Sequence, residues 1–237
     1  MNLLLQTNRR DFLKNTAAAA LALSPTLRGL ASELKEANKL PPPIELDKAL
    51  DSNASIWSVG EKKFVTTTLR TALKGKQHVA VFSMGAGCPH SEALMEVVCQ
   101  MAKKLPEQSQ VVVVINAGQE NTKDWVSGYK ALGIKNLTIV ADGQMQVLNS
   151  LELKVASVFH ELHADDAGKL RLVPTPDVTL PEGGRVSGKA PWRVATKETY
   201  VGIASKLGGS ELGKEIARIF PKQFDKIMYA CALAPEQ

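Results

Sequence analysis

An unbroken run of five β-branched residues, Val111 to Ile115, sets the first condition on the fold. A strand that is apolar at every position must be covered on both faces, whereas a half-exposed strand alternates apolar and polar residues. Other strand-like runs in the chain alternate with segments whose apolar residues recur at helical spacing. Such alternation is typical of parallel strands joined by helices. We therefore predict an α/β fold in which helices flank a central sheet.

The alternating pattern extends from about residue 55 to residue 173. Strands are predicted over Ser55–Val59, Val79–Ser83, Gln110–Ala117, Leu137–Ala141, Val155–Leu162 and Lys169–Val173. Helices are predicted over Glu92–Leu105, between a cap at Asn121 and a stop at Gly133, and over Gly143–Leu151.

A different pattern follows residue 173. Residues 174–195 contain four prolines and three glycines, which indicate a long surface loop. Beyond the loop, helices are predicted from a cap at Thr196 to Leu207, over Ser210–Ile219 and over Lys222–Leu233. The region 174–237 is therefore expected to be a loop followed by a C-terminal helical extension.

The first residues resemble a twin-arginine signal peptide. Arg9 and Arg10 are followed by a weakly apolar run from Thr16 to Leu23 and by small residues that end at Ala31. Signals of this kind are addresses for export. The apolar run has 8 residues, whereas a helix that crosses a bilayer needs roughly 20. We expect residues 1–31 to be removed, the protein to be secreted into the periplasm, and no permanent membrane span to remain. The alternative is an amphipathic first helix that contains two arginines.

Residues 32–54 are predicted to be a linker, because they are polar and include Pro41-Pro42-Pro43, which favours an extended conformation. The folded domain would then cover residues 55–173. The whole chain has a net charge of +5, and without residues 1–31 the charge falls to about +2. This small surplus gives no ground for a nucleic-acid partner.

One stretch of the chain places a cysteine at the start of a helix. The apolar strand Val79–Ser83 leads through the small-residue turn Met84-Gly85-Ala86-Gly87 to Cys88. Pro89 suits the first helical position, where its missing amide hydrogen is no loss. The unpaired amides and the positive dipole end of a helix stabilise a thiolate. We therefore predict that Cys88 is the reactive thiol.

On these residues the sequence resembles the thioredoxin-like superfamily, especially its periplasmic, membrane-linked thiol-disulfide proteins and the related peroxiredoxins. Leu73-Lys74-Gly75-Lys76 is similar to the turn before the central strand of that branch, and Asp165-Asp166-Ala167-Gly168-Lys169 is similar to its late β-turn. The resemblance covers roughly residues 55–173. It implies a thioredoxin-like sheet and redox chemistry at Cys88.

The chain departs from the superfamily in three ways. A dithiol member has Cys-x-x-Cys, but here the motif is Cys88-Pro89-His90-Ser91, and a hydroxyl can hydrogen-bond a thiolate but cannot release a mixed disulfide. The proline that faces the active cysteine would fall near Ser157 to His160, and the stretch Val155–His160 contains none. The residues that a peroxiredoxin needs before its cysteine are replaced by Met84-Gly85-Ala86. These departures argue against an ordinary disulfide-reductase cycle and against the peroxidase pattern.

The chain has three cysteines, so at least one is outside any intramolecular disulfide. Cys99 lies eleven residues after Cys88 on the same predicted helix, about 16 Å along its axis, which is too far for a disulfide. We expect Cys99 to be a buried structural thiol. Cys231 has two interpretations: a small apolar residue of the last helix, or a resolving thiol that a folded-back helix brings to Cys88.

Histidines allow a metal site as an alternative. The candidate ligands are Cys88, His90 and His160, and with the thioether of Met84 they would suit copper. Strand alternation sends His160 and His163 to opposite faces of the sheet, so at most one of them meets Cys88. The resemblance would then be to periplasmic copper-delivery proteins of the same fold, whose second cysteine is absent here. Structural or surface roles for the histidines are the competing interpretation.

Two functions follow from these observations. The first is a periplasmic thioredoxin-fold protein in which Cys88, tuned by His90 and Ser91, handles the redox state of a partner protein or a small molecule. Whether this makes it an enzyme, a thiol-dependent oxidoreductase, is left open by the sequence. The second is a non-enzymatic binding or copper-delivery module whose C-terminal helices dock to a partner. A flavodoxin-like protein without cysteine chemistry is a third alternative.

Overall fold

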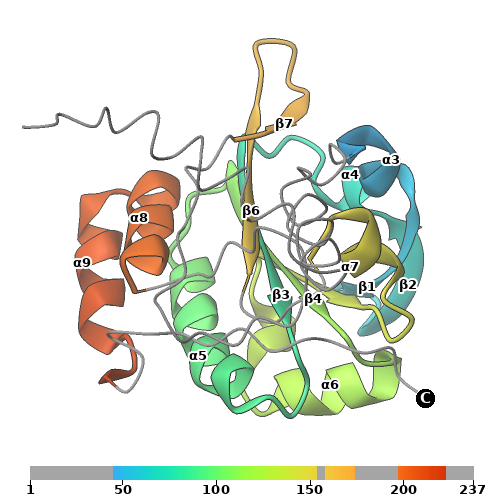
Figure 1. Ribbon diagram of the computed structural model, residues 1–237, viewed down its shortest axis with the longest axis horizontal. Helices are drawn as coiled ribbons and strands as arrows, with labels where there is room; N and C mark the ends of the chain where they lie inside the picture. Colours follow the sequence, from blue (N-terminus) through green and yellow to red (C-terminus); the bar gives the residue numbers. More distant parts are fainter. Residues whose placement is uncertain (1–44, 154–157, 174–196, 223–237) are drawn as a thin grey trace, which may run out of the picture. The chain divides into compact units, whose positions relative to one another are not determined.

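The computed structural model describes residues 45–153, 158–173 and 197–222 (Figure 1). All of these residues belong to one structural unit, which spans residues 43–237. The predicted signal peptide, the predicted loop and the predicted last helix with Cys231 lie outside the described residues.

The described strands form one seven-stranded sheet in the order β2-β1-β5-β4-β3-β6-β7. The central strands β3, β4 and β5 are parallel, and the remaining neighbours pair antiparallel. The strands are β1 (Asn53–Ser58), β2 (Lys63–Thr68), β3 (His78–Met84), β4 (Ser109–Ile115), β5 (Leu137–Ala141), β6 (Phe159–Ala164) and β7 (Leu170–Leu172).

Helices cover both faces of the sheet (Figure 1). One face packs against α5 (Pro89–Lys103), α6 (Gln119–Ser127), the 3₁₀ turn η1 (Ala131–Gly133), α8 (Lys197–Gly208) and α9 (Ser210–Ile219). The other face packs against α3 (Leu46–Asp51), α4 (Leu69–Ala72) and α7 (Gln146–Ser150). The prediction of an α/β sheet flanked by helices, with a C-terminal helical extension, is confirmed.

Strand β4 shows why both faces must be covered. All seven of its residues are buried. Val111 and Val113 contribute to the core beneath α5 and α8, whereas Val112 and Val114 contribute to the core beneath α4 and α7. A polar residue at any of these four positions would be removed from water without a partner, at a cost of several kcal/mol.

Aromatic stacking fixes α8 against the sheet. Tyr200 of α8 is fully buried, and its ring stacks on that of Phe82 in β3 with centroids 5.0 Å apart. At the other end of α8, the Ser109 hydroxyl of β4 donates a hydrogen bond of 2.8 Å to the Leu207 carbonyl. Helix α8 therefore runs antiparallel to β3, and its first turn lies toward the end of the sheet where β3 leads into α5.

Three elements were not expected from the sequence, namely α3, β2 and α4. Part of the predicted linker 32–54 is folded, because α3 buries Ala49 and Leu50 against the sheet. Strand β2 was missed although it is rich in β-branched residues, and it pairs with β1 along its whole length through a tight turn in which Lys62 has a φ of 53°. The predicted strand Val155–Leu162 is described only from Val158 onward, and its ladder begins at Phe159.

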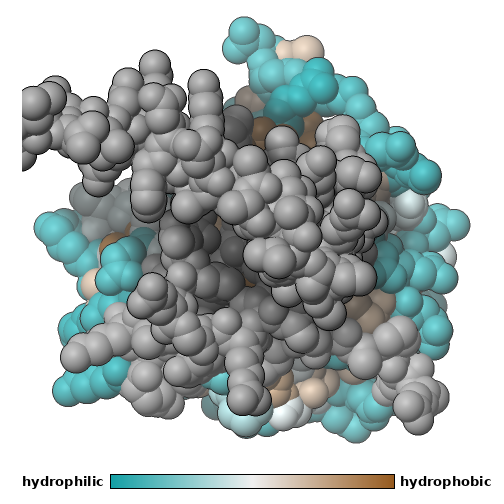
Figure 2. All heavy atoms as spheres, in the orientation of Figure 1, coloured by the Kyte–Doolittle hydropathy of each residue, from teal (hydrophilic) through white to brown (hydrophobic). Residues whose placement is uncertain are grey.

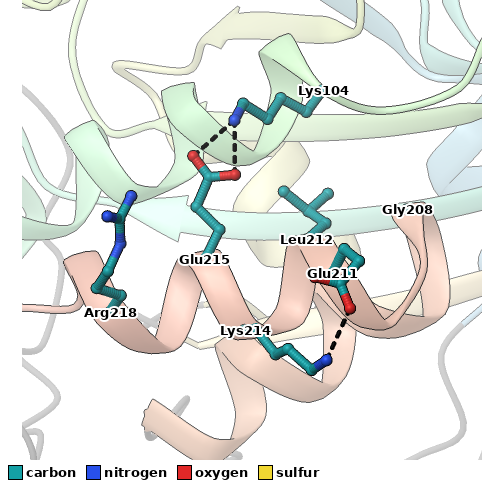
Figure 3. A pocket seen from close by; sticks show the side chains of 7 residues that line it. All are labelled: Lys104, Gly208, Glu211, Leu212, Lys214, Glu215 and Arg218. Atoms are coloured by element: carbon teal, nitrogen blue, oxygen red, sulfur yellow. Dashed lines mark hydrogen bonds and ion pairs between the residues drawn. The ribbon is translucent and has the colours of Figure 1, made fainter.

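The surface of the described residues is mostly hydrophilic in the view of Figure 2. Among them, the large apolar side chain that is exposed is Val59, at 50%. A shallow hollow of about 620 Å³ lies between the C-terminal end of α5 and α9 (Figure 3). Its charges are largely paired, since Lys104 contacts Glu215 at 2.6 Å and Lys214 contacts Glu211 at 2.7 Å. The hollow lies one helix length, about 22 Å, from the start of α5.

Candidate functional site

Cys88 lies where the sequence placed it, at the start of α5 and just beyond the carboxyl end of β3. It is the N-cap residue of α5, with φ −82° and ψ 121°, and Pro89 occupies the first turn. The Cys88 carbonyl accepts the Glu92 amide at 2.9 Å, which begins the helical ladder. The thiol itself makes no capping hydrogen bond and is half-buried. Cys88 therefore stands at the N-terminus of a four-turn helix, where the first backbone amides have no intrahelical partners.

The turn before Cys88 is built from backbone and hydroxyl groups. Gly87 has a φ of 73°, a backbone conformation that residues other than glycine rarely adopt. The Cys88 amide donates to the Gly85 carbonyl at 3.1 Å, and the Gly85 amide donates to the Ser91 hydroxyl at 2.9 Å. Ser91 is fully buried. The Ser91 hydroxyl thus accepts a hydrogen bond from the turn that carries Cys88, so its structural role is to hold this turn in place.

Sequence reasoning missed a second support of the same turn, Asn116. Its side-chain oxygen accepts a hydrogen bond of 3.2 Å from the Ala86 backbone amide, and its backbone amide donates one of 3.2 Å to the Met84 carbonyl. Asn116 follows the last residue of β4, which lies opposite Met84 in the parallel register. Polar residues just after buried parallel strands gather at the carboxyl edge of the sheet, where α/β proteins bind their ligands. The position of Asn116 directly after a buried strand was therefore the sequence signal that could have identified it as a site residue.

His90 stands in the first turn of α5 and is half-buried. Burial lowers the pKa of its imidazole below the ordinary value of 6.5. The ring is therefore neutral at pH 7 and does not supply a positive charge to a thiolate.

The structure does not bring His160 together with Cys88. His160 lies opposite Val81 in the β3–β6 ladder, on the face covered by α3, α4 and α7, whereas α5 packs on the other face. A ring nitrogen of His160 is hydrogen-bonded to the Leu151 carbonyl. His163 points to the opposite face from His160, as alternation requires. In the described part of the chain, no group of three His, Cys, Asp or Glu side chains is arranged to hold a metal ion, so the trio Cys88, His90 and His160 is not assembled.

Cys99 is buried in the core beneath α5, with 2% of its surface exposed. Burial is the main cause that raises the pKa of its thiol to about 11. It is therefore protonated at neutral pH and packed like a small apolar residue, as expected. Cys88 and Cys99 are both free thiols, and the proposed pairing of Cys88 with Cys231 falls outside the described residues.

Strand β3 leads into α5, which begins at Cys88, and the chain returns in β4, the parallel neighbour of β3. On its other side, β3 pairs with the antiparallel strands β6 and β7, and a final helical region follows them. This order of elements defines the type of sheet. The fold is thioredoxin-like. The assignment of Cys88 as the reactive thiol stays a prediction of the sequence.

The chain is similar to several solved structures, all at low sequence identity. No family model and no curated protein matches the chain. A secreted disulfide oxidoreductase of Mycobacterium tuberculosis, homologous to E. coli DsbE, is 15% identical with a TM-score of 0.39, over 57% of this chain and 91% of that one. An exposed lipoprotein thioredoxin of Streptococcus pneumoniae is 22% identical with a TM-score of 0.35, over 52% and 90%. Peroxiredoxin Q of Xanthomonas campestris is 14% identical with a TM-score of 0.34, over 57% and 74%.

In the described parts of the chain, no helix has the length and the apolar composition that crossing a membrane requires.

Proposed function

We propose that this chain is an exported thiol-redox protein of thioredoxin-like fold, in which Cys88 is the single reactive thiol and acts on a partner protein or a small molecule in the periplasm. The observation that carries the proposal is the position of Cys88 at the N-terminus of α5, after a buried strand and a hydrogen-bonded turn. The twin-arginine pattern at Arg9 and Arg10 supports the location.

The chemistry follows from the thiolate. The thiolate is the nucleophile of thiol chemistry, and cysteines at helix N-termini are, as a class, the reactive ones; Cys88 occupies such a position. The Cys88 sulfur attacks one sulfur of a disulfide, a new S–S bond forms, and the old one breaks to release the other sulfur as a thiolate. One disulfide replaces another, so this step needs no external oxidant or reductant.

Release of the mixed disulfide requires a second thiol. Ser91 carries a hydroxyl, which is held by the Gly85 amide. Cys99 is buried and lies eleven residues further along α5, about 16 Å away. The releasing thiol must therefore come from the partner, from a small-molecule thiol, or from Cys231. We infer that the site forms a stable mixed disulfide unless one of these is supplied.

Incubation of the full chain with oxidised glutathione tests the proposal. One glutathione adduct is expected per chain, mapped to Cys88 by peptide mass, and it should be absent in Cys88→Ser. The adduct should persist until a thiol is added. Absence of any adduct on Cys88 would remove the proposal. A Cys88–Cys231 disulfide in place of the adduct would replace the single-thiol mechanism with a two-thiol one.

The alternative is a non-enzymatic binding or copper-delivery module. It is favoured by the missing second cysteine and by the lack of proline within 155–160. In the described residues, the metal version is left with Cys88 and His90, because His160 is bound on the other face. Copper titration of the parent and of Cys88→Ser separates the two, since loss of binding in the variant supports the module and equal binding counts against it.

A further inference from the structure

Two histidines meet at the opposite end of β3 from Cys88. His78 of β3 and His163 of β6 are direct partners in the antiparallel register, so both side chains leave the same face of the sheet. Their rings are in edge-to-face contact, with centroids 4.8 Å apart. The His163 side chain is 38% exposed, and His78 is also partly exposed. Both imidazoles are therefore accessible from solvent and adjacent to each other.

A buried carboxylate orients one of the two rings. Glu161 is two residues before His163 on the same face of β6, and its side chain is only 4% exposed. One carboxylate oxygen contacts His163 Nε2 at 2.8 Å, and the other accepts Lys206 Nζ at 3.0 Å. An ionised carboxylate only accepts, so Nε2 must carry the hydrogen. A neutral His163 then has its lone pair on Nδ1.

This arrangement is the one that prepares a histidine to bind a metal. Metal-ligating histidines donate their second ring N–H to a carboxylate or carbonyl, which fixes the tautomer and leaves the other nitrogen as the ligand. Here Glu161 and His163 have this relationship, and His78 supplies a second imidazole on the adjacent strand.

We propose that His78 and His163 bind a divalent transition-metal ion that prefers imidazole, such as Zn²⁺ or Ni²⁺. The torsion that turns an imidazole about its Cβ–Cγ bond is soft, so both rings can direct a nitrogen at one ion. Because the described residues hold no preformed group of three ligands, water fills the other positions and the ion exchanges readily. The six steps of β3 from His78 to Met84 place the site about 20 Å before the turn that carries Cys88, so it is separate from the proposed thiol function.

Zinc titration of the full, folded chain, with Cys88 first alkylated, tests the site. The expected result is one Zn²⁺ per chain, with histidine NMR signals shifted for His78 and His163. His78→Ala and His163→Ala should each weaken binding at least about tenfold, and Glu161→Gln should weaken it by roughly 10-fold through loss of orientation. His90→Ala is the matched control and should bind as the parent does.

Two results would overturn the proposal: no binding at millimolar Zn²⁺, or equal affinity of the parent, His78→Ala and His163→Ala. If an alanine variant fails to fold, His78→Gln and His163→Gln repeat the test with polar side chains. The outcome is independent of the glutathione experiment, since Cys88 is blocked in the zinc titration and the two histidines are intact in the glutathione experiment.

Discussion

Ser91 offers a test of how the turn before Cys88 is held. Its hydroxyl is fully buried and accepts the Gly85 amide at 2.9 Å. Ser91→Ala removes the acceptor without adding volume, so the Gly85 amide remains buried without a partner. The substitution therefore isolates one hydrogen bond that fixes the strand end to the first turn of α5.

The magnitude follows from two opposing contributions. A buried donor left unpaired costs about 1–3 kcal/mol. Alanine is the better helix former and returns up to about 0.5 kcal/mol. The free energy of unfolding of Ser91→Ala should thus fall by about 0.5–3 kcal/mol, which corresponds to roughly 1–12 °C in Tm for a domain of this size.

Urea unfolding followed by circular dichroism measures this change. Ser127→Ala is the matched control, because the Ser127 hydroxyl donates to the Lys123 carbonyl at an exposed position of α6, and it should change the free energy of unfolding by less than about 0.5 kcal/mol. If Ser91→Ala were as stable as the parent, or if Ser127→Ala lost as much, the assigned role of Ser91 would be refuted.

Three further predictions concern other parts of the chain. A Cβ at Gly213 would lie within 1.9 Å of Ser205 Oγ between α8 and α9, so Gly213→Val should lower the urea midpoint by the equivalent of about 1–3 kcal/mol; an unchanged midpoint would contradict this packing. The pKa of Asp47 lies below 3.8, chiefly because Lys169 donates a hydrogen bond to its carboxylate and secondly because Arg70 of α4 does so. The contact between Lys169 and Asp47 therefore stabilises the fold above pH 3.8, and this stabilisation is lost as the pH falls below that value. Acid titration should show a smaller loss of stability in Lys169→Ala, and equal acid curves would refute the contact. Cys99, with a pKa raised to about 11, should be alkylated at neutral pH only after urea unfolding, and modification in the folded protein would show that it is not buried.

The sequence identified the parts of the fold that depend on local pattern. The β-branched run of β4, the turn at Gly87 and the start of α5 at Cys88 follow from periodicity, small residues and the proline at position 89. The opposite orientations of His160 and His163 followed from strand alternation.

The parts that were missed depend on contacts between distant residues. Helix α3 has six residues and is stabilised by the burial of Leu50 against the sheet, so its local pattern was too short to distinguish from a linker. Asn116 reaches Ala86 only because β3 and β4 are aligned in register. The partner of His160, the Leu151 carbonyl, likewise depends on how α7 packs on the sheet.

The reactivity of Cys88 is the central claim, and its alkylation rate tests that claim directly. Iodoacetamide modifies thiolates, and cysteines at helix N-termini are, as a class, more reactive at neutral pH than other cysteines. We predict that Cys88 in the folded chain is alkylated faster than the same residue in the urea-unfolded chain, despite being half-buried. A folded-state rate equal to or below the unfolded-state rate would contradict the assignment of Cys88 as the reactive thiol.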